Sequence, residues 1–234
     1  MIVAASGVTG RLPRLSTIQF DTVCARIDSP LHPWWARGPK RAIDIVVSVL
    51  LLVLLAPLLL ILAIGVRLTS GGPAIFAHTR CGLRGRPFRF YKFRSMVADA
   101  EARKRELIAL NEVQGPAFKI ARDPRITRFG HFLRKYSLDE LPQLWNVLIG
   151  NMSLVGPRPP TPGEVSAYTR RQAQRLSVVP GITGLWQVSG RSNIASFDQW
   201  VALDLTYIER WSLWLDLRIL ARTVLVVVRA EGSR

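Results

Sequence analysis

Cysteine and histidine are scarce in this chain, and neither is spaced like a metal ligand. Only two cysteines occur among the 234 residues, Cys24 and Cys81, and they lie far apart. The three histidines, His32, His78 and His131, form no H-x-x-x-H pattern. Zinc sites and redox pairs need closely spaced ligands. No zinc site and no redox pair is therefore expected, and the histidines are interpreted as structural or surface residues.

Acidic residues are also few. The chain has 16 Asp and Glu against 32 Lys and Arg, which gives a formal net charge of +16. Such a balance concerns solubility and partners rather than fold, and it suits anionic lipids, phosphorylated substrates or nucleic acid. Nucleic acid is not expected as a partner, because the sequence contains no helix-turn-helix or zinc signature.

The N-terminal segment lacks the marks of a secretory signal peptide. Residues 1–35 contain no continuous apolar core after their basic residues and no small-residue cleavage site after one. We therefore expect residues 1–36 to form a flexible tail. The total length suits one catalytic domain plus a membrane element rather than two large domains.

One long apolar run follows this tail. Residues 45–66 (IVVSVLLLVLLAPLLLILAIGV) carry no charge over 22 positions, and a straight helix of that length would be about 33 Å long, close to a bilayer core. Basic residues lie on both sides: Arg37, Lys40 and Arg41 before the run, and Arg67, Arg80, Arg84 and Arg86 after it. Because basic residues mark the cytoplasmic side, both flanks favour the same side. Pro57 removes a backbone donor near the middle and favours a bend. The sequence favours a re-entrant segment over residues 37–70, with a single spanning helix as the alternative.

Two strands and a helix are expected after the apolar run. Residues 74–76 predict a short strand, and residues 81–86 (CGLRGR) predict a glycine-containing turn. Residues 87–96 (PFRFYKFRSM) nearly alternate aromatic with basic residues, which predicts a strand with one apolar and one cationic face. The cationic face, with Lys92 and Arg94, either binds phosphate or is a solvated basic edge. Residues 97–110 (VADAEARKRELIAL) are rich in helix formers and predict a helix.

An acidic pair lies in the stretch SLDELPQLWN. Ser137 and Glu140 match the S-x-x-E capping box of a helix N-terminus. The alternative is a cap at Asp139, which places Pro142 within the first turn, where backbone donors are unpaired anyway. Asp139 and Glu140 would then lie at the positive end of a helix, where ionised carboxylates are favoured. Two adjacent carboxylates are a candidate nucleophile or divalent-metal site.

Two rigid turns and an aromatic-rich end complete the chain. Residues 156–160 (GPRPP) enclose Arg158, and a guanidinium presented by a fixed turn suits bidentate phosphate recognition. An ordinary Pro-rich loop is the alternative. Residues 180–184 (PGITG) predict another structured turn. Residues 197–228 predict one or two amphipathic helices, whose aromatic residues suit either a membrane interface or the protein core. These aromatic residues are Trp200, Tyr207, Trp211 and Trp214.

Together and in this order, the motifs resemble those of the bacterial sugar transferases. These are monotopic polyprenyl-phosphate hexose-1-phosphate transferases that start exopolysaccharide and glycan assembly. The resemblance runs from about Lys40 to Thr223, through KRAIDIVVS…LLAPLLL, RCGLRGRPFRFYKFRSM, DPRITRFGHFLRKYSLDELPQLWNVLIGNMSLVGPRP, PGITGLWQVSGR and YIERWSLWLDLRIL. Members of the family carry a re-entrant helix broken near a Ser-Pro dipeptide. Here that dipeptide is Ala56-Pro57, so the proline is kept and the serine hydroxyl is absent.

The resemblance implies a covalent mechanism carried by the acidic pair. An Asp-Glu pair is catalytic in the family and corresponds here to Asp139 and Glu140. Asp139 would attack the β-phosphate of a UDP-sugar, release UMP and form a phosphosugar–enzyme intermediate, from which polyprenyl phosphate takes the sugar-phosphate. Glu140 would hold Mg²⁺ or assist the acceptor, and both carboxylates are candidate Mg²⁺ ligands. The resemblance also implies cations that contact the substrate phosphates: Arg134, Arg158, Lys92 and Arg94.

The expected fold is α+β and mainly helical. It combines a re-entrant helix–break–helix, a small cytoplasmic catalytic domain over residues 71–195, and amphipathic interfacial helices over residues 196–234. The chain resembles the short form of the family, and Val179 stands where members often carry a cation. Its later motifs resemble members that transfer glucose- or galactose-1-phosphate.

The expected partners are a UDP-sugar, undecaprenyl phosphate and the lipid bilayer, and a homodimer is compatible with the sequence. The expected location is the cytoplasmic face of the bacterial inner membrane. Two other functions suit part of the pattern. A membrane-anchored glycosyltransferase would transfer the sugar without its phosphate and would release UDP. A non-enzymatic basic protein that binds anionic lipid would have no need of the Asp139–Glu140 pair.

Overall fold

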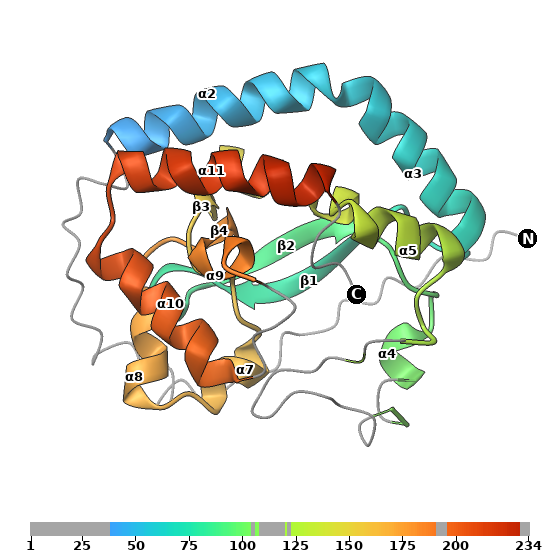
Figure 1. Ribbon diagram of the computed structural model, residues 1–234. Helices are drawn as coiled ribbons and strands as arrows, with labels where there is room; N and C mark the ends of the chain where they lie inside the picture. Colours follow the sequence, from blue (N-terminus) through green and yellow to red (C-terminus); the bar gives the residue numbers. More distant parts are fainter. Residues whose placement is uncertain (1–37, 104–105, 108–119, 121–122, 191–195, 230–234) are drawn as a thin grey trace, which may run out of the picture.

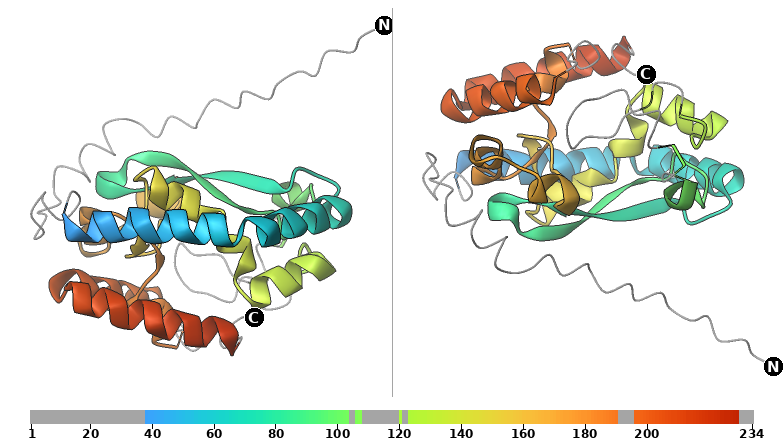
Figure 2. Two further views of the ribbon diagram at one scale, coloured as in Figure 1. Left: turned by 90° about the horizontal axis from the view of Figure 1, so that it is seen from above. Right: turned by 90° about the horizontal axis from the view of Figure 1, so that it is seen from below.

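The computed structural model describes residues 38–103, 106–107, 120, 123–190 and 196–229. The tail expected over residues 1–36 lies outside the described residues. The described chain is mainly helical with two small sheets, which confirms the expected α+β class. Helices α2 (Pro39–Leu54) and α3 (Ala56–Ser70) form an arch along one side of the molecule (Figure 1). In both views of Figure 2, α2 runs between the hairpin of β1 (Ile75–Cys81) and β2 (Pro87–Phe93) on one side and helix α11 (Leu213–Val228) on the other.

The arch bends at Leu55, the residue between the two helices. The helix axes differ by 65° at this break, and Pro57 lies in the first turn of α3, where its missing N–H leaves no helical bond unmade. Within the described residues, no single helix has both the length and the apolar character that crossing a membrane requires. Together, however, α2 and α3 meet both criteria as a bent pair. The bend predicted from Pro57 is therefore present.

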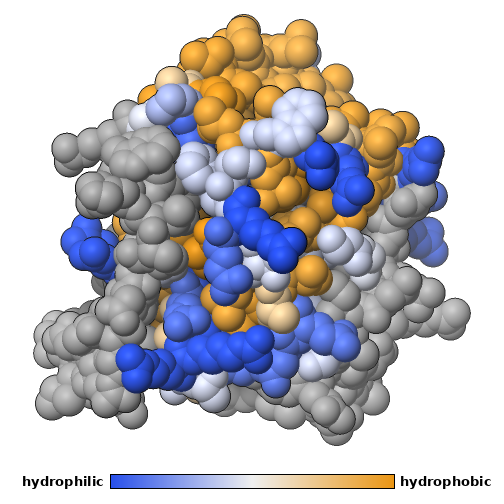
Figure 3. All heavy atoms as spheres, turned by 60° about the vertical axis from the view of Figure 1, so that its left-hand side comes forward, coloured by the Kyte–Doolittle hydropathy of each residue, from blue (hydrophilic) through white to orange (hydrophobic). Residues whose placement is uncertain are grey.

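The arch has an inverted pattern of burial. Its inner stripe on α2 is polar, since Lys40, Asp44 and Ser48 are buried at helical spacing. Its outer surface is apolar; Leu54 beside the bend is 74% exposed, and Leu68 near the end of α3 is 81% exposed. Figure 3 shows apolar residues gathered over the upper part of one face and hydrophilic residues below them. A water-solvated helix has the opposite arrangement.

The two predicted strands form an antiparallel hairpin. Strand β1 (Ile75–Cys81) pairs with β2 (Pro87–Phe93) over its whole length, so the first strand is longer than expected from its apolar residues alone. The turn between them contains a short 3₁₀ helix, η2 (Leu83–Gly85), in which Arg84 has a positive φ of 52°. The predicted turn at residues 81–86 is confirmed.

The helix predicted over residues 97–110 is much shorter in the structure. Helix α4 covers only Ala100–Arg103, and Glu106 and Leu107 form a turn. The remaining positions after Arg103 lie outside the described residues. The backbone N–H of Val97 donates to Arg125 O at 2.9 Å. The start of the segment is therefore bonded to a distant part of the chain instead of opening a helix.

The acidic pair lies in a single 3₁₀ turn between two helices. Helix α5 (Arg128–Lys135) is followed by η4 (Leu138–Glu140) and α6 (Gln143–Leu148). Ser137 has a positive φ of 53°, and its side chain caps nothing. Pro142 is the N-cap of α6. Ser137 is the N-cap of η4 by position, but the predicted capping box is absent because its side chain forms no capping hydrogen bond. The predicted cap at Asp139 is wrong, because Asp139 lies inside η4 and α6 begins only after Pro142.

The two rigid turns meet in the second sheet. Strands β3 (Ser153–Val155) and β4 (Gly181–Thr183) pair in parallel. Gly181 N donates to Pro157 O and Gly156 N donates to Thr183 O, both at 2.9 Å. A Cβ on Gly181 would lie 2.0 Å from Gly156 N, so the close approach requires glycine. The segment between the strands contains α7 (Pro162–Ser166), α8 (Arg170–Ala173) and the 3₁₀ helix η5 (Gln174–Ser177).

The C-terminal aromatic residues divide between core and surface. After the short helix α9 (Leu185–Val188), helix α10 (Phe197–Glu209) buries Trp200 and Tyr207, so the core alternative is correct there. Helix α11 exposes Trp214 to 67%, together with several aliphatic residues. One buried cluster takes residues from β2, α6, β3, α10 and α11, and side chains of α2 pack against it. The three segments expected as separate units thus share a core.

Candidate active site

The 3₁₀ turn that carries the acidic pair is held by the helix that follows it. Asn146 of α6 accepts from Tyr91 N at 3.1 Å and donates to Arg89 O at 2.6 Å, which ties α6 to β2. Arg41 of α2 donates to the last carbonyls of α6, among them Leu148 O at 2.7 Å. A cation at a helix C-terminus satisfies carbonyls that lack a partner and suits the helix dipole. Asp139 is fixed by these contacts and is only 7% exposed.

Helix α5 brings the first phosphate-binding candidate to the hairpin. Gly130 allows the approach, because a Cβ there would lie 1.9 Å from Ser95 O. Thr127 caps α5 by accepting from Gly130 N at 2.9 Å. Further along the same helix, Arg134 Nε donates to Ser95 Oγ at 2.9 Å. The guanidinium of Arg134 is thereby held beside the end of β2.

Lys92 on β2 lies among the charges of the site. Burial lowers the pKa of Lys92 to about 8; the carboxylate of Asp139 opposes this shift, Arg134 and Arg80 add to it, and Glu140 opposes it. The structure thus brings three other predicted site residues, Asp139, Glu140 and Arg134, within electrostatic reach of Lys92. Arg80 also lies within electrostatic reach of Lys92. From the sequence, Arg80 was interpreted only as a basic residue after the apolar run.

Arg94 has a different setting. Its Nε donates to Pro73 O at 3.0 Å, in the loop that follows α3, and its guanidinium lies 5.6 Å from the centre of the Phe76 ring. Arg94 therefore joins the hairpin to the end of the arch. Its predicted role in binding phosphate stays a prediction.

The turn at residues 156–160 presents Arg158 next to Arg80. Glu164 lies between them, with Oε1 3.7 Å from Arg158 Nη1 and Oε2 3.9 Å from Arg80 Nη1. Glu164 is fixed by its capping box with Thr161. Its carboxylate accepts a hydrogen bond from Thr161 N at 2.7 Å. Arg80 also donates to Pro159 O at 3.0 Å. We call Lys92, Arg134, Arg80 and Arg158 the phosphate cluster.

A buried ion pair between Arg175 and Asp204 supports the turn at residues 156–160. Arg175 donates from Nε to Asp204 at 2.7 Å, from Nη1 to Tyr168 Oη at 2.9 Å and from Nη2 to Arg158 O at 3.4 Å. Burial raises the pKa of Tyr168 to about 12, so its hydroxyl is protonated at neutral pH. Helix α10, which carries Asp204, thus positions Arg158. Sequence reasoning missed Arg175 and Asp204, because charged residues so far apart give no local signal.

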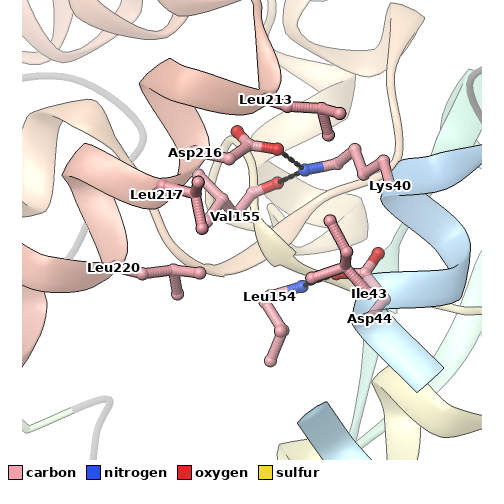
Figure 4. A pocket seen from close by; sticks show the side chains of 9 residues that line it. All are labelled: Lys40, Ile43, Asp44, Leu154, Val155, Leu213, Asp216, Leu217 and Leu220. Carbon is pink, nitrogen blue, oxygen red and sulfur yellow. Dashed lines mark hydrogen bonds and ion pairs between the residues drawn. The ribbon is translucent and has the colours of Figure 1, made fainter. Parts of the chain in front are cut away.

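A second charged group ties the arch to the domain. Lys40 Nζ forms an ion pair with Asp216 and donates to Val155 O at 3.0 Å (Figure 4). Asp216 also accepts from Tyr207 Oη at 2.8 Å, and Asp44 accepts from Leu154 N at 3.0 Å. We call Lys40, Asp44, Tyr207 and Asp216 the anchor cluster. Lys40 and Arg41, interpreted from sequence as flanking charges of a membrane segment, therefore make specific contacts with the domain.

The donor chemistry of the acidic pair decides whether it suits magnesium. Within the part of the chain that the structure describes, no group of three or more His, Cys, Asp or Glu residues could hold a metal. Mg²⁺, however, is usually bound by one or two carboxylates together with waters and substrate phosphates. Asp139 and Glu140 beside the phosphate cluster fit that donor set.

Comparison with known proteins identifies the family. Residues 35–230 match the model of the family described as bacterial sugar transferase. The chain belongs to the bacterial sugar transferase family. This transferase is 50% identical over 195 residues to a protein named galactosyl transferase CpsE from Streptococcus agalactiae serotype III (83% of this chain, 43% of that protein).

Two further relatives carry more specific names. The chain is 44% identical over 217 residues to the undecaprenyl-phosphate galactose phosphotransferase of Salmonella typhimurium (91% of this chain, 45% of that protein). It is 44% identical over 203 residues to the UDP-glucose:undecaprenyl-phosphate glucose-1-phosphate transferase of Caulobacter vibrioides (83% of this chain, 71% of that protein). The chain spans less than half the length of the first two of these three relatives.

Proposed function

We propose that this sugar transferase moves a hexose-1-phosphate, glucose or galactose, from a UDP-sugar to undecaprenyl phosphate and releases UMP. The reaction would start the assembly of an exopolysaccharide or another glycan. The observation that carries the proposal is the position of Lys92. This residue lies within electrostatic reach of both carboxylates of the Asp139–Glu140 pair and of two arginines, so a carboxylate nucleophile and the cations for a diphosphate occupy one site.

The chemistry requires a carboxylate to attack an anionic phosphate. In the first step an Asp139 oxygen forms a bond to the β-phosphorus, the bond from that phosphorus to the bridging oxygen breaks, and its electron pair leaves on UMP. In the second step an oxygen of the polyprenyl phosphate attacks the same phosphorus and frees the Asp139 carboxylate. The cations of the phosphate cluster reduce the repulsion between nucleophile and substrate and offset the developing charge.

Magnesium is proposed as the cofactor. Asp139 and Glu140 would hold it, and it would supply positive charge to the donor phosphates. Glu140 lies next to the nucleophile in the same 3₁₀ turn, and it would hold the ion or orient the acceptor. The buried Asp139 is kept in place by the contacts of α6 described above.

The arch is proposed to enter one leaflet of the inner membrane from the cytoplasmic face and return. Its 65° bend, its apolar outer surface and its polar inner stripe support this arrangement. Both of its ends pack onto the same body, through Lys40 at the start and Ser70 at the finish, which are buried. Exposed apolar residues also flank the acidic pair, namely Phe132 on α5 and Trp145 on α6. A lipid-linked acceptor could therefore reach Asp139 from the bilayer surface.

The deciding experiment is the identity of the released nucleotide. Purified protein in detergent is given Mg²⁺, undecaprenyl phosphate and a panel of UDP-sugars, and the nucleotide product is identified. UMP from UDP-glucose or UDP-galactose, absent with Asp139→Asn, is the expected result. Release of UDP would instead assign the chain to the membrane-anchored glycosyltransferases, an alternative that suits the name of the Streptococcus relative. Full turnover in excess EDTA would contradict the magnesium proposal.

A further inference from the structure

One face of the hairpin carries a row of polar side chains that leads away from the acidic pair. Side chains alternate between faces along a strand, so three cross-strand pairs share this face. These pairs are Phe76 with Lys92, His78 with Phe90, and Arg80 with Phe88. Lys92 therefore lies at the end of the row nearest Asp139, and Arg80 lies two positions beyond His78. The backbone positions at the two ends are about 13 Å apart along the strands.

Arg80 is a buried cation whose bonding is incomplete. Its side chain is only 14% exposed, and it lies 5.4 Å from the centre of the Phe90 ring. Its Nε atom is buried and has no hydrogen-bond partner within the described part of the chain. Its ion-pair partner in the described part of the chain is Glu164, at 3.9 Å, and Glu164 is shared with Arg158. Burial, followed by the charge of Arg158, lowers the pKa of Arg80 to about 9.

Two guanidiniums that share one carboxylate favour an additional anion. A buried donor without a partner is unfavourable until a ligand accepts its hydrogen bond. Guanidiniums bind phosphate oxygens through parallel N–H bonds, which makes phosphate the anion that best suits the pair. The Arg158 side chain is 37% exposed, so the pair is accessible from solvent on one side while Arg80 is fixed in the interior.

We propose that Arg80, together with Arg158, binds the α-phosphate of the donor and stabilises it as it departs on the nucleotide. Lys92 and Arg134 then hold the β-phosphate that Asp139 attacks. This assignment rests on the proposed function, since it concerns the leaving group of that reaction. When the bond from the β-phosphorus to the bridging oxygen breaks, its electron pair becomes a new charge on the α-phosphate of UMP. A cation already fixed beside that phosphate offsets the charge without reorganisation.

The assignment also gives the donor an orientation. The sugar-phosphate end lies at the Asp139 end of the hairpin face, and the nucleoside end lies beyond Arg80, towards the turn at residues 156–160 and helix α7. The two phosphates thus occupy different pairs of cations. A substitution at Arg80 is therefore expected to change the binding of the product nucleotide as well as the binding of the donor.

The test compares UMP with uridine, which differ only by the phosphate. Dissociation constants for both are measured by calorimetry on the full chain in detergent, for the wild type, Arg80→Gln, Arg80→Lys and Arg89→Gln. Arg89 is the matched control, because it belongs to the same hairpin, is exposed and points to the opposite face. We expect Arg80→Gln to weaken UMP binding at least tenfold and to leave uridine binding unchanged. Arg80→Lys should weaken UMP binding less than Arg80→Gln does, and Arg89→Gln should change neither dissociation constant.

The outcomes separate this inference from the proposed function. A ratio of UMP to uridine affinity that is unchanged in Arg80→Gln would overturn the role of Arg80. Equal losses for both ligands in Arg80→Gln and Arg80→Lys would also overturn it, because they indicate a structural role. The nucleotide assay on the wild type tests the proposed function by itself. If the wild type releases UMP and the ratio does not change, only the assignment of Arg80 fails. If the wild type releases UDP, both fail.

Discussion

The anchor cluster combines a cation with two carboxylates and a tyrosine, whereas the phosphate cluster consists of cations alone. In the anchor cluster, Lys40 is paired with Asp216, which also accepts from Tyr207 Oη, and the three side chains are buried. In the phosphate cluster, Arg80 and Arg158 share the single carboxylate of Glu164. The two clusters therefore differ in their balance of charge.

This contrast separates structural charge from charge that is available to a ligand. A buried pair whose partners are both present holds elements together, and removing one partner leaves an uncompensated charge. A group of cations with too few carboxylates is unfavourable by itself and becomes favourable when an anion binds. Substitutions in the anchor cluster should therefore lower stability, and those at the phosphate site should lower activity with little effect on stability.

The largest expected effect is the loss of activity in Asp139→Asn. Removing a nucleophile costs about 10³-fold or more in turnover, and the similar shape of asparagine preserves the packing of the 3₁₀ turn. We expect the thermal unfolding midpoint to change by less than about 4 °C, which corresponds to roughly 1 kcal/mol in a chain of this size. Turnover and thermal unfolding are measured on the same preparation. A large loss of stability would show that Asp139 belongs with the structural charges.

The anchor cluster should respond to Asp216→Asn mainly through stability. This change leaves the buried Lys40 cation without its carboxylate, and breaking such a pair costs about 3 to 5 kcal/mol. The free energy of unfolding is measured by denaturant titration in detergent. Asp198→Asn is the control, because Asp198 on α10 is exposed and accepts a hydrogen bond from the partly exposed Gln172, and it should change stability by less than about 0.5 kcal/mol. Equal effects of the two substitutions would remove the distinction between the clusters.

A charge on the outer surface of the arch should weaken membrane association. Leu54 lies beside the bend and is highly exposed, and a lysine in the apolar part of a membrane costs about 2.5 to 3.5 kcal/mol on insertion scales. We expect Leu54→Lys to move a substantial fraction of the protein out of the membrane in vesicle flotation. Ala102→Lys, which adds the same charge at an exposed position of α4, should float like the wild type. Identical flotation of both variants would argue against insertion of the arch.

The smallest expected effect is a pH dependence due to Lys92. Its pKa is lowered to about 8, so the cation is present below that pH and is lost as the pH rises through it. The value of kcat/KM reports the ionisation of the free enzyme and should fall between pH 7 and 9, by up to about tenfold per unit above the pKa. In Lys92→Arg the positive charge persists over this pH range. The fall in kcat/KM between pH 7 and 9 should therefore be absent, even if the maximal kcat/KM is lower than in the wild type. If kcat/KM of Lys92→Arg falls as it does in the wild type, the pH dependence belongs to another ionisable group.

The sequence predicted those features that depend on neighbouring residues. The turn at residues 81–86 and the strand after it followed from glycines and from alternation over residues 87–96, and both are present, whereas the antiparallel pairing of the two strands was not predicted. The break in the arch followed from Pro57, because proline is disfavoured inside a helix and is accommodated in the first turn of a new one. The two turns at residues 156–160 and 180–184 were found from their glycines and prolines, although their contact with each other was not.

Features that depend on distant residues were missed or misplaced. The capping box at Ser137 is consistent with local preferences, yet the chain reverses there and the hydroxyl caps nothing. Lys40 and Arg80 were interpreted only by their position beside the apolar run. Their partners, Asp216 and Glu164, are 176 and 84 residues away in the chain, so no local pattern connects them.

By itself, the sequence determined the class of the fold, the bent apolar segment, the acidic pair and the family. These follow from residue order, because helix breaks, strand alternation and motif spacing are properties of short stretches of chain. Only the tertiary structure decided which charges are satisfied and which are available to a ligand. A charge is balanced by whatever lies near it in space, and packing brings Asp216 to Lys40 but brings a second guanidinium to Arg80.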